Sequence, residues 1–148
     1  MKIHYICRSN VFRSRIAEAY TNAKQLPNIS CSSSGVAAGE NNVGDVCWEF
    51  ELLAEVYGLV PYMSKTWQRT KSEMLDQSDV IICMDDSIYV QVASLYPSIK
   101  DKQHEVWNIV DLPDLDSDDE SKILYHIQRS KEDYVEIRSK VDDLLSRL

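Results

Sequence analysis

The sequence contains few glycines and prolines: four of each occur in 148 residues, and no stretch is rich in either. It has no internal repeat and no low-complexity tract. Linkers between domains are commonly rich in such residues, so we predict a single domain over residues 1–148. A chain of this length can bury about two-thirds of its unfolded surface without disulfides or metal ions.

Cysteine is also infrequent, with four residues that form neither close pairs nor a cluster with histidine. This pattern argues against a disulfide framework and against a zinc site. No hydrophobic run approaches the ~20 residues that a membrane span needs, and no secretory signal precedes the first predicted strand. We therefore expect a cytoplasmic, reducing location, with no metal, no cofactor and no membrane partner.

Basic residues are outnumbered, since 16 Lys and Arg stand against 24 Asp and Glu, for a formal net charge of −8. Nucleic acid and anionic membrane surfaces repel such a chain, so neither is expected as a partner. Any site for an anion must then be a local concentration of positive charge within a negative surface.

Strand-like and helix-like segments alternate along the chain. The strand predicted at 79–84 contains a continuous apolar run, which is typical of a buried parallel strand. This alternation predicts an α/β fold, a single three-layer domain in which helices flank a four-stranded parallel sheet. Strands are predicted at 2–7, 29–34, 79–84 and 105–110, and helices at 14–26, 45–58, 70–77, 86–97 and 119–147.

The most informative stretch is residues 3–14, in which a strand ends at Cys7 and a helix begins near Arg13. Loop amides and a helix N-terminus concentrate partial positive charge, and a guanidinium binds two oxygens of an anion at once. A Cys in this positive field is expected to be a thiolate, and thus a nucleophile, at neutral pH. The pattern predicts a phosphate loop after the first strand, in which Cys7 attacks a phosphate group that Arg13 holds.

This stretch resembles the phosphate loop of the low-molecular-weight protein tyrosine phosphatase family, and similar motifs follow in family order along nearly the full length. The resemblance implies hydrolysis of phosphomonoesters, phosphotyrosine in proteins above all, through a cysteinyl-phosphate intermediate. The substrate would be a phosphorylated protein or a small phosphomonoester. The matching positions are Cys7, Asn10, Arg13, Ser14, Ala17-Glu18, Ser33-Ser34-Gly35, Asn42-Val43-Gly44, the segment from Asp79 to Asp85, and Asp111-Leu112-Pro113-Asp114.

The resemblance also implies the roles of three catalytic residues. Cys7 is the nucleophile, and Arg13 stabilises the charge of the transferring phosphoryl group. Asp114 is the general acid and then the base, because the acid loop of the family aligns at this position. Asp111 is the alternative acid in the same crowded acidic segment. Asp85 is expected to support the loop without taking part in the chemistry.

The rest of the loop is predicted to bind the phosphate group. Asn10 is expected to adopt a positive φ, because Asn tolerates this region better than other non-glycine residues. Ser14 is placed to donate a hydrogen bond to the thiolate and to cap the helix. The resemblance suggests that Ser33, with Ser34 as second choice, holds Asn10. The predicted substrate-binding residues are Arg8, Ser9, Asn10, Val11, Phe12 and Ser14.

The sequence departs from the family pattern in four places. Ser9 replaces a loop glycine, and Phe12 replaces a second loop cysteine that protects the nucleophile from over-oxidation in many relatives. Asn41 and the pair Leu115-Asp116 stand where aromatic residues usually enclose a phosphotyrosine ring, so ring affinity is expected to be weaker. Val11 still resembles the branched apolar residue of tyrosine-specific relatives, whereas phosphoarginine-specific relatives carry Thr at that place.

Two other functions remain open from the sequence. One is a phospho-binding module of the same fold without turnover, which the altered acid loop favours. The other is a thiol-dependent arsenate reductase. That reaction needs two further redox cysteines near the end of the third strand, where only Cys83 is close, and Cys83 is expected to be a core residue.

Overall fold

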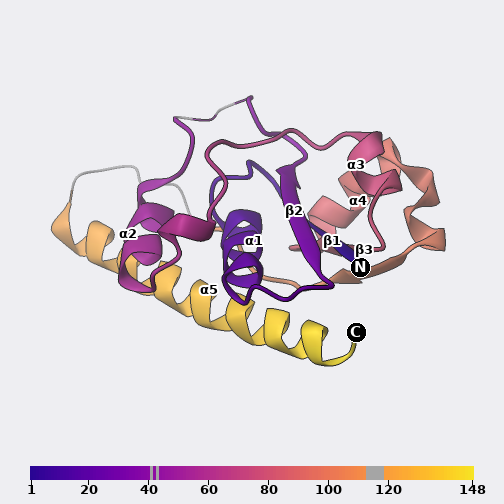
Figure 1. Cartoon of the computed structure of the whole chain (residues 1–148). Coiled ribbons are helices and arrows are strands. Elements are labelled where there is room, and N and C mark those ends of the chain that lie inside the picture. Colours follow the sequence, from indigo (N-terminus) through magenta and orange to yellow (C-terminus); the bar gives the residue numbers. More distant parts are fainter. Residues whose placement is uncertain (41, 43, 113–118) are drawn as a thin grey trace.

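In the part of the chain that the structure describes, four parallel strands form one sheet (Figure 1). This computed structural model describes residues 1–40, 42, 44–112 and 119–148. All strand pairings in the sheet are parallel, so the carboxyl ends of the strands meet at one edge. Ligands of α/β sheets bind beyond this edge, which is where β1 ends. The strands are β1 (Lys2–Cys7), β2 (Ser30–Gly35), β3 (Val80–Cys83) and β4 (Gln103–Val106), in the order β2-β1-β3-β4.

Helices cover both faces of the sheet, which confirms the predicted three-layer α/β fold. On one face α1 packs against β1 and β2, and α5 packs against α1 and α2; α4 lies against β3 on the other face. In Figure 1 the long α5 passes beneath α1 and α2. The helices are α1 (Arg13–Ala23), α2 (Trp48–Val56), α3 (Ser72–Asp76), α4 (Asp86–Leu95) and α5 (Glu120–Ser146), with 3-10 turns η1 (Val60–Tyr62) and η2 (Pro97–Asp101). None of the described helices has the length and apolar character that crossing a membrane requires.

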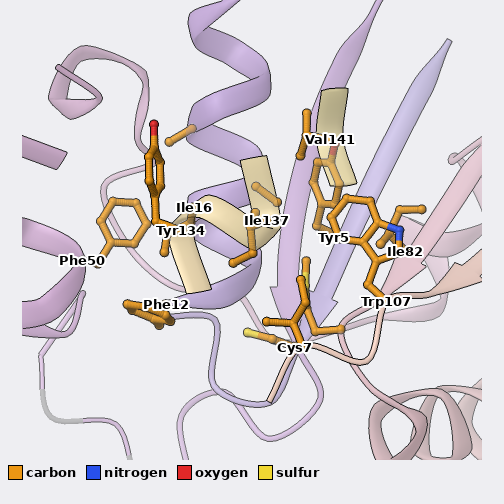
Figure 2. Packing of buried hydrophobic residues seen from close by; sticks show 14 of the residues in the cluster. Tyr5, Cys7, Phe12, Ile16, Phe50, Ile82, Trp107, Tyr134, Ile137 and Val141 are labelled. Atoms are coloured by element: carbon orange, nitrogen blue, oxygen red, sulfur yellow. The ribbon is translucent and has the colours of Figure 1, made fainter. Parts of the chain in front are cut away.

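Alternate residues of β1 supply two separate cores. Ile3 and Tyr5 belong to the larger cluster, between the sheet and helices α1, α2 and α5, whereas Ile6 packs with residues of α3, α4 and η2. This alternation follows from the period of two along a strand. Cys7 and Phe12 lie at the same end of the larger cluster (Figure 2), so the beginning and end of the predicted phosphate loop are anchored in the core.

The predicted elements are confirmed to within a few residues, with one exception. A strand was expected over 105–110, but β4 ends at Val106. Asn108 has a φ of 55°, which turns the chain out of the extended conformation. The Ile109 amide still donates to the Met84 carbonyl oxygen over 2.8 Å, so the segment after β4 continues along β3 to the carboxyl edge of the sheet.

A buried carboxyl group in α5 opposes folding at neutral pH. Asp133 is 1% exposed, and its Oδ2 has no hydrogen-bond partner among the described residues. Burial raises the pKa of Asp133 to about 6, although the charge of Arg129, 3.6 Å away, partly opposes the shift. An unfolded Asp has a pKa of about 3.9, so folding favours the protonated form.

Replacement of this carboxyl by an amide, Asp133→Asn, should therefore stabilise the protein at neutral pH. We expect the free energy of unfolding at pH 7 to 8 to rise by on the order of 1–2 kcal/mol, allowing for solvent screening. The gain should vanish below about pH 4, where Asp133 is protonated in both states, and develop as the pH rises to about 6. Urea denaturation between pH 4 and 8 measures it.

Asp142→Asn is the control of opposite sign. Burial acts to raise the pKa of Asp142, but the hydrogen bonds from Lys24 and Tyr20 outweigh it and lower the pKa. Removing this carboxylate should reduce stability at neutral pH. If Asp133→Asn were also less stable than the parent protein at pH 7, the assignment for Asp133 would be wrong.

Candidate active site

The predicted phosphate loop, residues 8–12, joins the end of β1 to the start of α1. Asn10 has a φ of 58°, as predicted. The loop lies directly against Gly35, the last residue of β2. A Cβ atom on Gly35 would lie 2.6 Å from the Arg8 carbonyl oxygen and 2.7 Å from the Asn10 amide nitrogen. Only glycine permits this approach, so the neighbouring strand helps to set the path of the loop.

The Cys7 sulfur is buried and lies close to two hydrogen-bond donors. Ser14 Oγ is 2.9 Å from Sγ, and the Asn10 amide nitrogen is 3.2 Å from it. Asn10 Nδ2 donates to Ser14 Oγ over 2.8 Å. The Ser14 hydroxyl can then donate its proton to the sulfur, which lies nearer than its other acceptor, the Ser34 carbonyl oxygen at 3.4 Å. A thiolate here would accept hydrogen bonds from both groups.

A network of buried side chains holds Asn10 in place. Asn10 Nδ2 also donates to Ser33 Oγ over 2.9 Å, while its Oδ1 accepts from the Gln68 amide at 2.8 Å, so both ends of the side-chain amide are engaged. Ser33 in turn donates to Glu18 Oε2 over 2.6 Å. The expected contact between Ser33 and Asn10 is confirmed. The second choice, Ser34, instead forms a hydrogen bond with His4.

The Arg13 guanidinium is fixed through one of its nitrogens. Nη1 donates to Asp85 Oδ2 over 2.7 Å and to the Ile109 carbonyl oxygen over 2.8 Å. Among the described residues no hydrogen bond uses Nε or Nη2, although Asp111 Oδ2 lies 3.5 Å from Nη2. Burial alone would lower the pKa of Arg13, but Cys7, Asp111 and Asp85 together raise it. The charged group therefore keeps donors for an anion.

Asp85 supports this arrangement from the end of β3. Its Oδ1 accepts from the Ile88 amide over 2.9 Å and caps α4, while its Oδ2 accepts from Arg13. Burial acts to raise the pKa of Asp85, but the hydrogen bonds from Arg13 and from the Ile88 and Ser87 amides, together with the charge of Arg13, outweigh it and lower the pKa. The carboxylate is charged at neutral pH, as a partner of the guanidinium needs to be.

A second buried guanidinium ties the loop to the segments before and after α2. Arg15 is fully buried, and its Nη1 donates to the carbonyl oxygens of Asn10 (3.0 Å) and Asp45 (2.8 Å). Its Nη2 donates to the Ser64 carbonyl oxygen. The guanidinium carbon lies 5.7 Å from the centre of the Phe50 ring. The sequence did not predict a role for Arg15, because its partners are backbone oxygens of distant residues and no motif indicates such contacts.

The loop opens into a cavity of about 240 Å³. Of the eleven residues that line it, six are Cys7, at the end of β1, and five residues of the predicted loop and α1. The others come from the start of α2, the segment after β4, and α5. The lining residues are Cys7, Arg8, Ser9, Val11, Phe12, Arg13, Cys47, Glu49, Asp111, Leu112 and His126.

One wall of this cavity is a buried ionisable pair. His126 Nδ1 lies 3.3 Å from Glu49 Oε1, and both side chains are less than a tenth exposed. The pair joins α5 to α2 beside the nucleophile. No sequence pattern predicts this pair, since the two residues are 77 positions apart and share no motif.

The structure brings most of the predicted site residues together. Cys7, Arg13 and most of the loop residues between them line one cavity together with Asp111, and Ser14 lies within hydrogen-bond distance of the Cys7 sulfur. The predicted acid, Asp114, lies outside the described residues. Asn41 and the pair Leu115-Asp116, which stand where the family usually has aromatic residues, also lie outside the described residues.

Two of the departures from the family pattern have a structural explanation. Ser9 is not among the described non-glycine residues with positive φ, so a side chain is tolerated where relatives have glycine. Phe12 is 4% exposed and belongs to the larger hydrophobic cluster. The aromatic ring therefore anchors the loop in the core and leaves no second thiol in the loop.

The first strand of the parallel sheet ends at a buried thiol, and the loop that follows it ends at a charged guanidinium. This arrangement is that of a cysteine-dependent phosphatase. Among the described residues, no group of three or more His, Cys, Asp or Glu side chains could hold a metal ion. The family model "Low molecular weight phosphotyrosine protein phosphatase" matches residues 2–148. The chain belongs to this family.

Proteins of similar sequence and structure are phosphatases. The chain is 24% identical over 147 residues to a protein-arginine-phosphatase of Geobacillus stearothermophilus, covering 99% of this chain and 95% of that protein. A low molecular weight protein tyrosine phosphatase from Streptococcus pyogenes has a similar structure, with a TM-score of 0.77, 18% identity, and coverage of 99% and 92%. For the arginine phosphatase structure from G. stearothermophilus the TM-score is 0.73 at 20% identity, with coverage of 99% and 94%. These likenesses confirm the fold.

The contact between Gly35 and the loop leads to a prediction. Gly35→Ala should displace the loop, because its Cβ meets backbone atoms at 2.6–2.8 Å. We expect kcat/KM for p-nitrophenyl phosphate to fall by on the order of 100-fold or more, since positioning errors of about 1 Å cost that much. Gly58→Ala, at a φ of 69° with open space around it, should lower stability slightly and leave kcat/KM unchanged. Equal kcat/KM for both variants would exclude this role for Gly35.

Proposed function

We propose that this protein hydrolyses phosphomonoesters through a covalent intermediate on Cys7. The observation that carries the proposal is the position of the Cys7 sulfur: it lies 2.9 Å from the Ser14 hydroxyl, in the same cavity as the Arg13 guanidinium. Membership of the phosphatase family supports the same chemistry. No residue of the proposal requires a metal ion or an organic cofactor.

The reaction takes place in two steps. In the first, the Cys7 thiolate forms a bond to phosphorus, the ester P–O bond breaks, and an acid protonates the leaving oxygen. In the second, a water molecule attacks the cysteinyl-phosphate and gives a proton to the same carboxylate. Inorganic phosphate leaves and the thiolate is restored. In both steps the loop amides and Arg13 stabilise the charge on the equatorial oxygens, and Ser14 stabilises the departing sulfur.

The acid is proposed to be Asp114, on the alignment with the family, with Asp111 as the alternative. Asp111 lines the cavity, and its carboxylate lies 3.5 Å from the Arg13 guanidinium, half exposed. This contact suits a residue that orients Arg13. The alignment with the family therefore keeps Asp114 as the first candidate for proton transfer.

The two candidates differ in what their removal should do. Asp114→Asn should slow hydrolysis of an alkyl phosphate at least 100-fold more than that of p-nitrophenyl phosphate, whose leaving group needs no proton. Asp111→Asn should affect both substrates alike, through Arg13. Steady-state kcat values for the four combinations decide the matter, with Cys7→Ser as the blank. A larger leaving-group dependence in Asp111→Asn would assign the acid to that residue instead.

The proposed substrate class is phosphotyrosine in proteins, which the name of the family model and the branched side chain of Val11 favour. Phosphoarginine is the second candidate. A specific observation supports it: two carboxylates, Glu49 and Asp111, line the cavity around the nucleophile. Carboxylates accept bidentate hydrogen bonds from a guanidinium, whereas they make few favourable contacts with an aromatic ring.

A panel of phosphotyrosine, phosphoarginine and phosphoserine peptides should separate these candidates. If phosphotyrosine is the substrate, its kcat/KM should exceed the others at least tenfold, and Glu49→Gln should change it little. If phosphoarginine is the substrate, Glu49→Gln should reduce its kcat/KM by roughly 10- to 100-fold, the effect of losing a hydrogen bond between charged groups. Failure of the wild-type protein to exceed the Cys7→Ser blank on any substrate would leave only phosphate binding.

The arsenate reductase alternative lacks support from the remaining thiols. Cys83 is fully buried in β3, as predicted, and burial raises its pKa to about 12. A thiol so protonated and enclosed exchanges poorly with a disulfide. All four cysteines are free, which suits the reducing, cytoplasmic location that we propose because Cys7 must remain a thiol.

A further inference from the structure

The cavity around Cys7 is continuous with a groove along α2. A first hollow of about 440 Å³ shares Ser9, Val11 and Cys47 with the catalytic cavity and extends to Trp48 and Glu51. A second hollow, of about 640 Å³, begins at these last two residues and continues to η1. We call the two hollows the α2 groove. Beyond the residues already named, it is lined by Asn42, Val46, Leu52, Ala54, Glu55, Val60 and Met63.

The groove combines exposed apolar surface with negative charge. Trp48 is 38% exposed and Val60 is 52% exposed. Glu51 and Glu55 are exposed on the same side of α2, because they are four residues apart. Neither glutamate forms an ion pair with any residue in the described ranges.

Helix stability does not explain the two glutamates. Like charges at this spacing repel each other, and Glu55 lies in the last turn of α2, where the helix dipole disfavours negative charge. Glu51 alone, in the first turn, is favourably placed. A partly exposed tryptophan beside an uncompensated acidic pair is instead typical of a surface that binds apolar and basic side chains.

We propose that the α2 groove binds the polypeptide segment next to the phosphorylated residue of a protein substrate, and that it selects segments with a large apolar side chain and Lys or Arg. The proposal rests on the proposed function. The position of the groove indicates what occupies it. When the phosphate of a substrate residue is bound at Arg13, the neighbouring chain lies at the mouth of the catalytic cavity, where the groove begins at Ser9 and Cys47.

The length of the groove gives the number of residues involved. The nine residues of α2 span about 13 Å at 1.5 Å per residue. An extended peptide covers that distance with about four residues. The apolar side chain would contact Trp48, nearest to the catalytic cavity, and the basic side chains would lie farther along, beside Glu51 and Glu55. A small phosphomonoester would not reach the groove at all.

Matched phosphotyrosine peptides test the proposal. One carries Leu and two Lys within four residues of the phosphotyrosine, a second carries Ala in place of Leu, and a third carries Glu in place of Lys; each is made with these residues on the N-terminal or the C-terminal side. For wild-type protein we expect kcat/KM to be at least tenfold higher for the Leu-Lys peptide than for the Glu peptide on one side only. High salt should reduce this ratio.

The variant Glu51→Lys/Glu55→Lys should reverse the preference for Lys over Glu while leaving kcat/KM for p-nitrophenyl phosphate within twofold of the wild type. Trp48→Ala should remove the preference for Leu over Ala. Glu73→Lys/Asp101→Lys, which reverses two exposed charges on α3 and η2, is the matched control. Because all charge reversals make the protein less acidic, a general electrostatic effect would appear in the control as well.

The proposal can fail independently of the proposed function. Equal kcat/KM for the Leu-Lys and Glu peptides, or equal responses in Glu51→Lys/Glu55→Lys and Glu73→Lys/Asp101→Lys, would overturn it even if p-nitrophenyl phosphate is hydrolysed. If no substrate is hydrolysed, binding of the same peptides to the Cys7→Ser variant, measured by fluorescence anisotropy, still tests the groove. Dissociation constants that do not depend on the flanking residues would exclude it.

Discussion

The side-chain amide of Asn10 is the interaction on which the site depends. Its Nδ2 donates to Ser14 and Ser33, and its Oδ1 accepts from the backbone of Gln68. These three bonds hold a non-glycine residue at a φ of 58°, a conformation that is unfavourable for an isolated residue. The amide also donates to the Ser14 hydroxyl oxygen, whose proton can point to the Cys7 sulfur 2.9 Å away. One side chain thus fixes both the shape of the loop and the hydrogen bonding of the nucleophile.

Positive charge is scarce in this protein, and the structure concentrates it behind the loop. With a formal net charge of −8, the surface repels phosphorylated substrates at long range. The two buried guanidinium groups, Arg13 and Arg15, compensate locally: one keeps donors for an anion, and the other holds the loop backbone. Asp85 and the Ile109 carbonyl oxygen hold Arg13 through Nη1, so within the described residues the other guanidinium N–H groups keep their protons for an anion. A basic patch on the surface would be a poorer solution, since solvent and salt screen exposed charges.

Specificity depends on elements other than those that carry the chemistry. The loop comes from β1 and α1, whereas the cavity walls come from α2, the segment after β4 and the first half of α5. Glu49 and His126 meet across two of these elements and give the cavity a polar wall. Farther along α2, a tryptophan and two carboxylates line the groove that we propose for the chain next to the phosphorylated residue. The same catalytic loop could therefore serve quite different substrates through changes in these walls.

Much of the fold and of the reaction centre was predictable from local sequence. The apolar periods gave the strands and helices, and the spacing of Cys7, Asn10 and Arg13 within one strand-loop-helix unit determined the phosphate loop, because neighbours in sequence are necessarily neighbours in space there. The positive φ at Asn10 followed from residue type alone. By contrast, β4 was misplaced, because nothing in the local pattern showed that Asn108 would turn the chain.

Only the tertiary structure decided what surrounds the nucleophile. Glu49 and His126 are 77 positions apart, and Arg15 binds carbonyl oxygens contributed by distant loops. Such contacts depend on how helices pack on a sheet, and packing brings together side chains whose spacing along the chain carries no information. The sequence by itself determined the chemistry of this protein, and the packing of α2 and α5 determined the walls against which a substrate must fit.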